Sequence, residues 1–168
     1  RGSGGDNEAW QENTNLAYEY ETRLQKEFGN AYKKWNEEYG GIDYVTGHSL
    51  GGNLAQFGVI KYGDDKVKCT AYDSPGFSQA FIEGHADGIV NRKDQIKMIA
   101  ASTDYVNVLN KQITDNTEYI DIDDELCHPQ NSHKSTKLLD SALINENGDF
   151  KENKKCKQNL LVKYFGKI

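Results

Sequence analysis

The stretch that most constrains the fold is Val45–Ala55, which reads Val-Thr-Gly-His-Ser-Leu-Gly-Gly-Asn-Leu-Ala. It contains a G-x-S-x-G motif centred on Ser49, between a short apolar segment at 42–46 and an apolar segment with helical character that extends to about Tyr62. A strand, a tight turn and a helix in this order predict a nucleophile elbow, a strained turn that lifts the serine hydroxyl above the sheet edge. Glycines at 47 and 51 leave room for the strand and the helix to cross closely.

The rest of the chain alternates between strand and helix patterns. Helical spacing of apolar residues predicts helices, the first of them broken near Gly29, and β-rich runs between turn residues predict strands. We expect helices over 8–36, 77–92 and 153–164, strands over 66–72, 95–101 and 118–122, and a hairpin turn at Asn147-Gly148. Such alternation is typical of an α/β fold with a mostly parallel sheet and helices on both faces.

Composition limits the classes of function. The 168 residues suit a single domain over 1–168, and the net charge of −6 without a basic patch argues against nucleic-acid binding, which needs clustered Lys and Arg. No apolar run reaches the roughly 18 residues of a membrane span. Three cysteines, Cys69, Cys127 and Cys156, are widely spaced without a C-x-x-C pair, so we expect free thiols and neither a disulfide framework nor a metal site.

A serine nucleophile needs a base to take its proton and a carboxylate to orient that base. The G-x-S-x-G elbow resembles that of the α/β-hydrolases, and this resemblance implies that the acid and then the histidine follow the serine along the chain. Asp104, in the loop after the strand at 95–101, is the preferred acid, because that loop faces the same sheet edge as Ser49. Asp73, one strand earlier, is the alternative, although it is better placed to order the Pro75-Gly76 turn.

Four histidines are candidates for the base. His48 lies inside the elbow, where its side chain is expected to point away from the serine, and His85 precedes the acid and falls in a helical segment. His133 is preferred, because it follows the last strand in a loop before an apolar segment. His128, in the turn-like Cys127-His128-Pro129, is the alternative. This chemistry requires no cofactor and no metal.

The elbow sequence Thr46-Gly47-His48-Ser49-Leu50-Gly51-Gly52, followed by Leu54-Ala55, resembles that of the class 3 (fungal-type) lipase family within the α/β-hydrolases. Arg1-Gly2-Ser3 with the downstream Trp10 resembles the family's Arg-Gly-Thr segment, with Ser where the family has Thr, and Asp104-x-Val106 resembles its Asp-x-Val. The resemblance implies that Ser3 supplies an oxyanion-hole donor, beside the backbone N–H of Leu50 at the helix start.

In that family the Arg-Gly-Thr segment directly follows a core strand. The resemblance therefore implies that residues 1–168 are the C-terminal part of a longer domain and lack its N-terminal strands. One sheet edge would then need cover from an upstream segment or a protein partner, because unpaired strand edges invite pairing.

The function expected from these features is hydrolysis of carboxylic ester bonds in lipids, either acylglycerols or glycerophospholipids, through an acyl-enzyme. Such an enzyme would contact a membrane or lipid interface. A short-chain esterase or thioesterase is the enzymatic alternative, and a catalytically silent hydrolase-like binding module is the alternative from another class. Few prolines and many Lys and Asn indicate a bacterial source, with secretion favoured over a cytoplasmic location.

Overall fold

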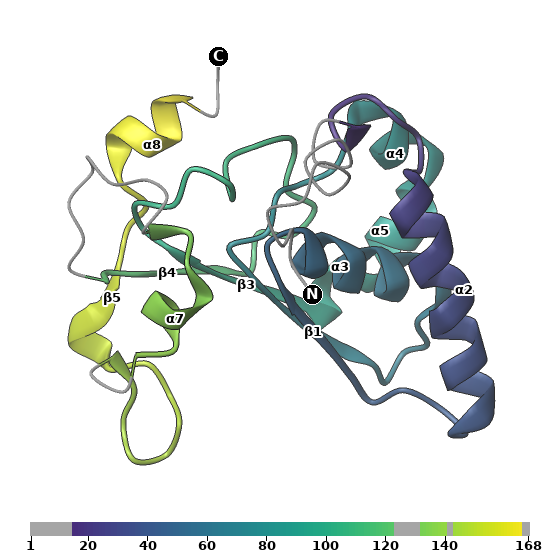
Figure 1. The fold of residues 1–168 in the computed structure, drawn as a ribbon, viewed down its shortest axis with the longest axis horizontal. Coiled ribbons are helices and arrows are strands. Elements are labelled where there is room, and N and C mark those ends of the chain that lie inside the picture. The colour runs from purple at the N-terminus through teal and green to yellow at the C-terminus, as the bar shows by residue number, and fades with distance from the viewer. Residues whose placement is uncertain (1–14, 123–131, 141–142, 166–168) are drawn as a thin grey trace.

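The computed structural model describes residues 15–122, 132–140 and 143–165 (Figure 1). Short helices and strands alternate along most of this length. In chain order they are α2 (Arg23–Glu38), β1 (Tyr44–His48), α3 (Leu50–Tyr62), β2 (Lys68–Tyr72), α4 (Gln79–Gly84), α5 (Ala86–Arg92), a 3-10 turn (Lys93–Gln95), β3 (Ile96–Ala101), β4 (Thr117–Ile120), α7 (Ser135–Leu138), a second 3-10 turn (Glu152–Lys154), β5 (Lys155–Cys156) and α8 (Leu160–Phe165).

The five strands form one sheet in the order β1-β2-β3-β4-β5. The first four run parallel, and only the short β5 is antiparallel to its neighbour. The predicted α/β fold with a mostly parallel sheet is therefore confirmed. Because β1, β2 and β3 point the same way, the loops after all three strands gather at one edge of the sheet.

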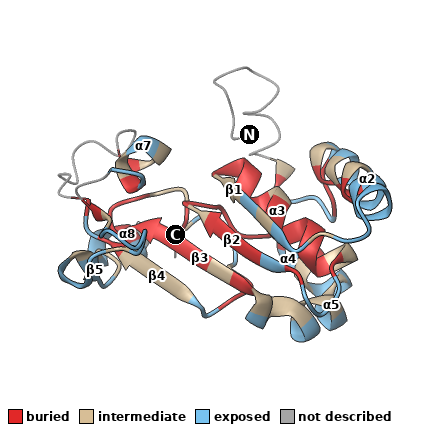
Figure 2. Ribbon diagram, turned by 90° about the horizontal axis from the view of Figure 1, so that it is seen from below, coloured by how far each residue is buried: buried red, intermediate tan, exposed pale blue. Residues whose placement is uncertain are grey.

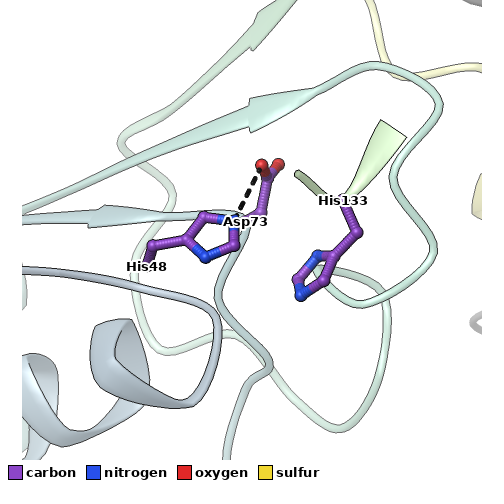
Figure 3. A group of neighbouring side chains, drawn as sticks. All are labelled: His48, Asp73 and His133. Atoms are coloured by element: carbon purple, nitrogen blue, oxygen red, sulfur yellow. Dashed lines mark ion pairs between the residues drawn. The ribbon is translucent and has the colours of Figure 1, made fainter. Parts of the chain in front are cut away.

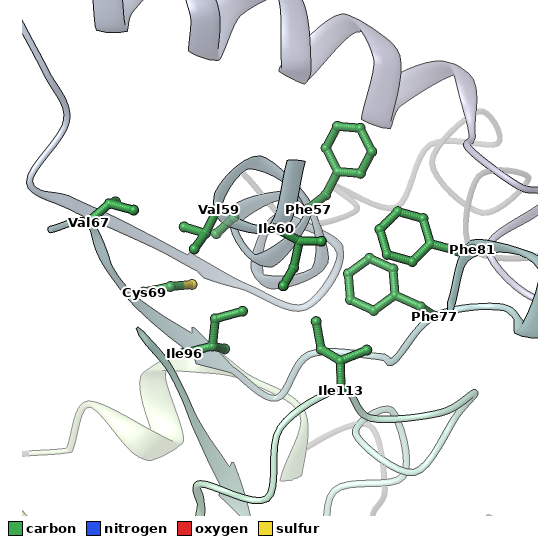
Figure 4. Close-up of a cluster of buried hydrophobic side chains, with 10 residues drawn as sticks. Phe57, Val59, Ile60, Val67, Cys69, Phe77, Phe81, Ile96 and Ile113 are labelled. Atoms are coloured by element: carbon green, nitrogen blue, oxygen red, sulfur yellow. The ribbon is translucent and has the colours of Figure 1, made fainter. Parts of the chain in front are cut away.

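Each face of the sheet is covered by a different set of apolar side chains. Val45, Cys69 and Ile96 share one row across β1, β2 and β3 and pack against α3, in the cluster that also holds Phe57 and Ile60 (Figure 4). Side chains alternate between the two faces of a strand. Three residues further along β3, Ile99 therefore lies on the opposite face, where it packs in a second cluster with Ile120 and with Leu138 of α7.

Helices thus lie on both faces, with α3 on one and α7 on the other. The helix α2 forms an outer layer against α3. In Figure 2 much of β2 and β3 is buried, whereas α2 carries many exposed residues. Gly58 of α3 permits this contact, since a Cβ there would lie 2.8 Å from both Phe28 and Tyr32 of α2.

Three helix predictions need correction. The break predicted near Gly29 is wrong: α2 crosses that residue without interruption and begins instead at an N-cap, Thr22, in a reciprocal capping box with Gln25. A Cβ on Gly29 would lie 2.6 Å from Tyr62, so this glycine serves close packing between helices rather than a break. The part of the predicted helix up to residue 14 lies outside the described residues, and the predicted helix at 77–92 is two helices that meet at His85.

The helix predicted over 153–164 is wrong in its first half. Lys155 and Cys156 form β5 on the edge of β4, and the helix α8 begins only at Leu160, where Asn159 Oδ1 accepts from the backbone N–H of Leu161 at 3.0 Å. The turn at Asn147-Gly148 is confirmed. Gly148 has φ 85°, and an isolated antiparallel bridge joins Ile144 to Phe150.

The strand β1 stands at one end of the sheet. Within the described residues no strand pairs with its outer edge, and Tyr44 on this strand is 57% exposed. An upstream segment or partner over this edge stays a prediction.

Two further expectations concern the thiols and the membrane. Cys69 and Cys156 are free thiols, as predicted, while Cys127 lies outside the described residues. Within 15–122, 132–140 and 143–165, no helix has the length and apolar character that a membrane span requires.

Candidate active site

Ser49 occupies the sharp turn between β1 and α3. Its backbone adopts φ 58° and ψ −130°, a positive φ that non-glycine residues rarely take and that marks a strained turn. The turn depends on missing side chains, because a Cβ on Gly47 would lie 2.2 Å from the Gly51 carbonyl oxygen and a Cβ on Gly52 would lie 2.8 Å from Ser74. Gly51 therefore takes part in the close crossing of strand and helix through its backbone, which Gly47 approaches. Gly52, rather than Gly51, is the second position where an added Cβ would clash.

Three predicted side chains meet at the carboxyl edge of the sheet. His133 Nε2 lies 2.7 Å from Ser49 Oγ, and His133 Nδ1 lies 2.9 Å from Asp104 Oδ1. An ionised carboxylate can only accept, so Nδ1–H donates to Asp104 and Nε2 is left to accept from the Ser49 hydroxyl. Asp104 is fully buried, Ser49 is 4% exposed, and the side chain of His133 is 24% exposed. Of these three side chains, only that of His133 keeps a substantial exposed fraction.

The acid is held by a residue that the sequence interpretation overlooked. Asn107 donates to Asp104 Oδ2 from its backbone N–H at 2.8 Å and from its side-chain Nδ2 at 3.0 Å. The loops that carry the acid and the base are joined where Thr103 Oγ1 donates to Ser132 Oγ at 3.0 Å. An Asp in a loop is itself a signal that its carboxylate accepts from a nearby backbone N–H, here that of the third residue on. The contact with Ser132 has no comparable local signal.

The surroundings of His133 favour its charged form. Burial lowers the pKa of the imidazole, but the hydrogen bond and the negative charge of Asp104, with the charge of Asp73, outweigh burial and raise the pKa above the ordinary 6.5. A base with a raised pKa accepts the serine proton more readily. Asp104 is placed to stabilise the imidazolium that would form.

His48 and Asp73 lie beside this arrangement. The ring of His48 packs against that of His133 with centroids 4.9 Å apart, so it does not point away from the site as predicted. Asp73 is fully buried, and its Oδ1 accepts from the backbone N–H of Ala101 at 2.8 Å. The turn that Asp73 was expected to order is held instead by Asn53, whose Nδ2 donates to the Gly76 carbonyl at 2.9 Å.

The remaining candidates are placed as follows. Leu50 is the first residue of α3, and the first backbone N–H groups of a helix have no partner within it, so this amide is placed to donate to a developing oxyanion. His85 lies at the α4–α5 junction, where Nε2 pairs with Glu21 at 2.9 Å. Ser3 and His128 lie outside the described residues.

Fold and site together define a class: an α/β protein with a serine on a strained elbow, hydrogen-bonded to a histidine that pairs with a buried aspartate. The family model described as Mbeg1-like matches residues 1–126, and the chain belongs to this family, which is related to the lipase-like α/β-hydrolases. The matched segment includes Ser49 and Asp104 but ends before His133. No curated protein and no solved structure matches the chain.

Proposed function

We propose that this protein is a serine hydrolase that cleaves carboxylic ester bonds of lipids. The observation that carries the proposal is the hydrogen-bonded series from Ser49 through His133 to Asp104, with distances of 2.7 and 2.9 Å. A serine, a base and an orienting carboxylate within hydrogen-bond reach are the three groups that a Ser-His-Asp triad uses for covalent acyl transfer.

The proposed reaction has two halves. His133 Nε2 takes the proton of Ser49 as its oxygen attacks the ester carbonyl, and the resulting oxyanion accepts from the Leu50 N–H, with Ser3 as the second predicted donor. His133 then passes the proton to the departing alcohol, which leaves an acyl group on Ser49. In the second half His133 takes a proton from water, the hydroxide attacks the acyl carbonyl, and the free acid leaves as Ser49 regains its proton.

Exposed apolar side chains near the site favour a lipid over a small ester. On α8, Leu160 is 81%, Leu161 59% and Tyr164 68% exposed. The start of α8 is tied to the acid loop: the backbone N–H of Asn159 donates to the Ser102 carbonyl at 3.0 Å. Exposed apolar groups beside a reactive site are suited to contact with acyl chains or a lipid surface. The resemblance to class 3 lipases supports the same substrate class.

The test compares substrates of increasing acyl length. We expect hydrolysis of p-nitrophenyl esters to rise from acetyl to long acyl chains and phospholipid vesicles to be cleaved. Ser49→Ala should reduce every rate by roughly 10³-fold or more while circular dichroism stays unchanged.

Two further outcomes separate the alternatives. Replacing Leu160 and Leu161 by Gln should slow cleavage of vesicles but leave soluble short esters unaffected. Fastest turnover on acetyl or thioester substrates would instead favour a short-chain esterase or thioesterase. A folded protein that hydrolyses none of these substrates would contradict the proposal and favour a binding module.

A further inference from the structure

Two polar atoms beside the proposed active site face one another as an ion pair that is too long for a hydrogen bond. His48 Nε2 and Asp73 Oδ2 lie 3.7 Å apart, which is beyond hydrogen-bond distance (Figure 3). Both atoms are buried, and neither has a hydrogen-bond partner among the described residues. Buried polar groups in native proteins nearly always have hydrogen-bond partners, so two buried ligand atoms that lack them are suited to holding an ion between them.

A third ligand lies within reach of the same point. His133 approaches from the other side in Figure 3, and one ligand atom from each of His48, Asp73 and His133 lies within 4.8 Å of the other two. Two imidazoles and one carboxylate are a typical donor set for Zn²⁺. We propose that these three residues form a binding site for Zn²⁺ or a similar divalent ion of the late first-row metals, and that the ion acts as an inhibitor.

The geometry requires only a small adjustment. Zinc bonds of about 2.0–2.2 Å in a tetrahedral site place ligand atoms roughly 3.3–3.6 Å apart. The 3.7 Å between His48 Nε2 and Asp73 Oδ2 is already near this value. The ligand atom of His133 lies within 4.8 Å of the other two and must approach by about 1.2–1.5 Å at most, which rotation of its side chain can supply. The ion would also neutralise Asp73, a carboxylate that is fully buried.

Inhibition follows from the double use of His133. Its Nδ1 pairs with Asp104 and its Nε2 faces Ser49, so an ion on either nitrogen breaks one of the two contacts that proton transfer needs. Binding of the ion is independent of the proposed hydrolase activity. Only the inhibitory consequence rests on that function.

The binding test uses the Ser49→Ala protein, so that no hydrolysis is needed. Calorimetric titration with Zn²⁺ should give one ion per chain, and His48→Phe and Asp73→Asn in this background should each weaken binding by tenfold or more. The matched control is His85→Gln, which removes a histidine that pairs with Glu21 at the α4–α5 junction and should leave the affinity unchanged. Circular dichroism verifies folding, and if Asp73→Asn fails to fold, His48→Phe alone decides.

Co²⁺ identifies the ligand type. A spectrum with tetrahedral d–d bands and no thiolate charge-transfer band is expected for nitrogen and oxygen ligands, whereas a thiolate band would assign the ion to a cysteine and overturn the site. Equal Zn²⁺ affinity for the parent and the His48→Phe protein would overturn it as well.

A second arm measures ester hydrolysis by the protein with Ser49 intact. Zn²⁺ should inhibit it, EDTA should restore it, and His48→Phe should need at least tenfold more Zn²⁺ for the same inhibition. Equal sensitivity of the two proteins would overturn the inhibitory role. A protein that binds Zn²⁺ at these residues but hydrolyses no ester would contradict the proposed function and leave the metal site supported.

Discussion

At the scale of single residues, the proposed chemistry depends on how Asp104 orients His133. Two donors from Asn107 hold one carboxylate oxygen of Asp104, which leaves the other to accept from His133 Nδ1. A replacement that keeps the shape of Asp104 but removes its charge would favour the wrong imidazole tautomer and would not stabilise the imidazolium.

Asp104→Asn is therefore expected to lower kcat for ester hydrolysis by roughly 10³- to 10⁴-fold with little change in KM. The measurement is steady-state kinetics on a long-chain p-nitrophenyl ester. The exposed Asp65→Asn serves as a charge-matched control. A decrease in kcat of less than tenfold for Asp104→Asn would show that another group acts as the acid, and Asp73 is the first candidate.

Residue-level inference from sequence succeeded where chain order carries the information. Ser49, Asp104 and His133 were chosen from the elbow and from the loops that follow each strand, and the structure brings these three together. The sequence does not predict the hydrogen bonds from Asn107 to Asp104 or the contact between His48 and Asp73, because those contacts depend on which loop tips meet after folding. Alternation along β1 alone does not reveal that the His48 ring meets that of His133.

At the scale of elements, β4 is joined to both neighbouring strands through Glu118. This carboxylate lies 2.7 Å from Lys97 Nζ of β3 and 3.3 Å from Lys155 Nζ of β5. Partial burial raises the pKa of Glu118, but the hydrogen bonds and charges of the two lysines outweigh it and lower the pKa below the ordinary 4.5. A carboxylate whose pKa is lower in the folded than in the unfolded state stabilises the fold at pH values above the unfolded pKa. This contribution is lost as the pH falls through the folded pKa.

Glu118→Gln should thus reduce the free energy of unfolding at pH 7 by up to about 1 kcal/mol, since both lysines are partly exposed to solvent. The difference from the parent should shrink below pH 4.5 and vanish as the parent carboxylate becomes protonated. Urea unfolding at several pH values measures both quantities, with the exposed Glu37→Gln of α2 as control. A difference that stays constant down to pH 3 would contradict the ion-pair origin.

The sequence predicts helices and strands correctly where the apolar pattern is long or clearly bounded by turn residues, as in the strand, elbow and helix from β1 to α3. The predictions are wrong where tertiary contacts determine the secondary structure. The run 153–164 has enough Lys and Leu for a helix, yet its first residues pair with β4 as β5. Gly29 looks like a helix breaker, yet it lies inside α2 because Tyr62 of α3 occupies the space of its missing side chain.

At the scale of the whole molecule, the core between the sheet and α3 can be monitored through one thiol. Cys69 of β2 is 2% exposed, and burial raises the pKa of its thiol to about 12. Because the thiolate is the reactive species, this cysteine is expected to react only after the sheet opens.

In a chain with Cys127→Ser and Cys156→Ser, labelling of Cys69 by a disulfide reagent should therefore rise with urea in parallel with loss of circular dichroism. A chain that keeps only the exposed Cys156 should label before unfolding. Rapid labelling of Cys69 in native buffer would show that the apolar cluster around Phe57 and Ile96 opens locally. This cluster would then not unfold together with the rest of the protein in one cooperative step.

Whether Ser49 is an activated nucleophile can be measured by covalent labelling. The folded protein is treated with a fluorophosphonate probe, and the modified peptide is identified by mass spectrometry. The structure predicts a single covalent adduct on Ser49, lost in Ser49→Ala and strongly slowed in His133→Ala, because the 2.7 Å contact with His133 Nε2 supplies the base. A folded protein that gives no adduct, or that is labelled equally after Ser49→Ala, would show that Ser49 is not an activated nucleophile.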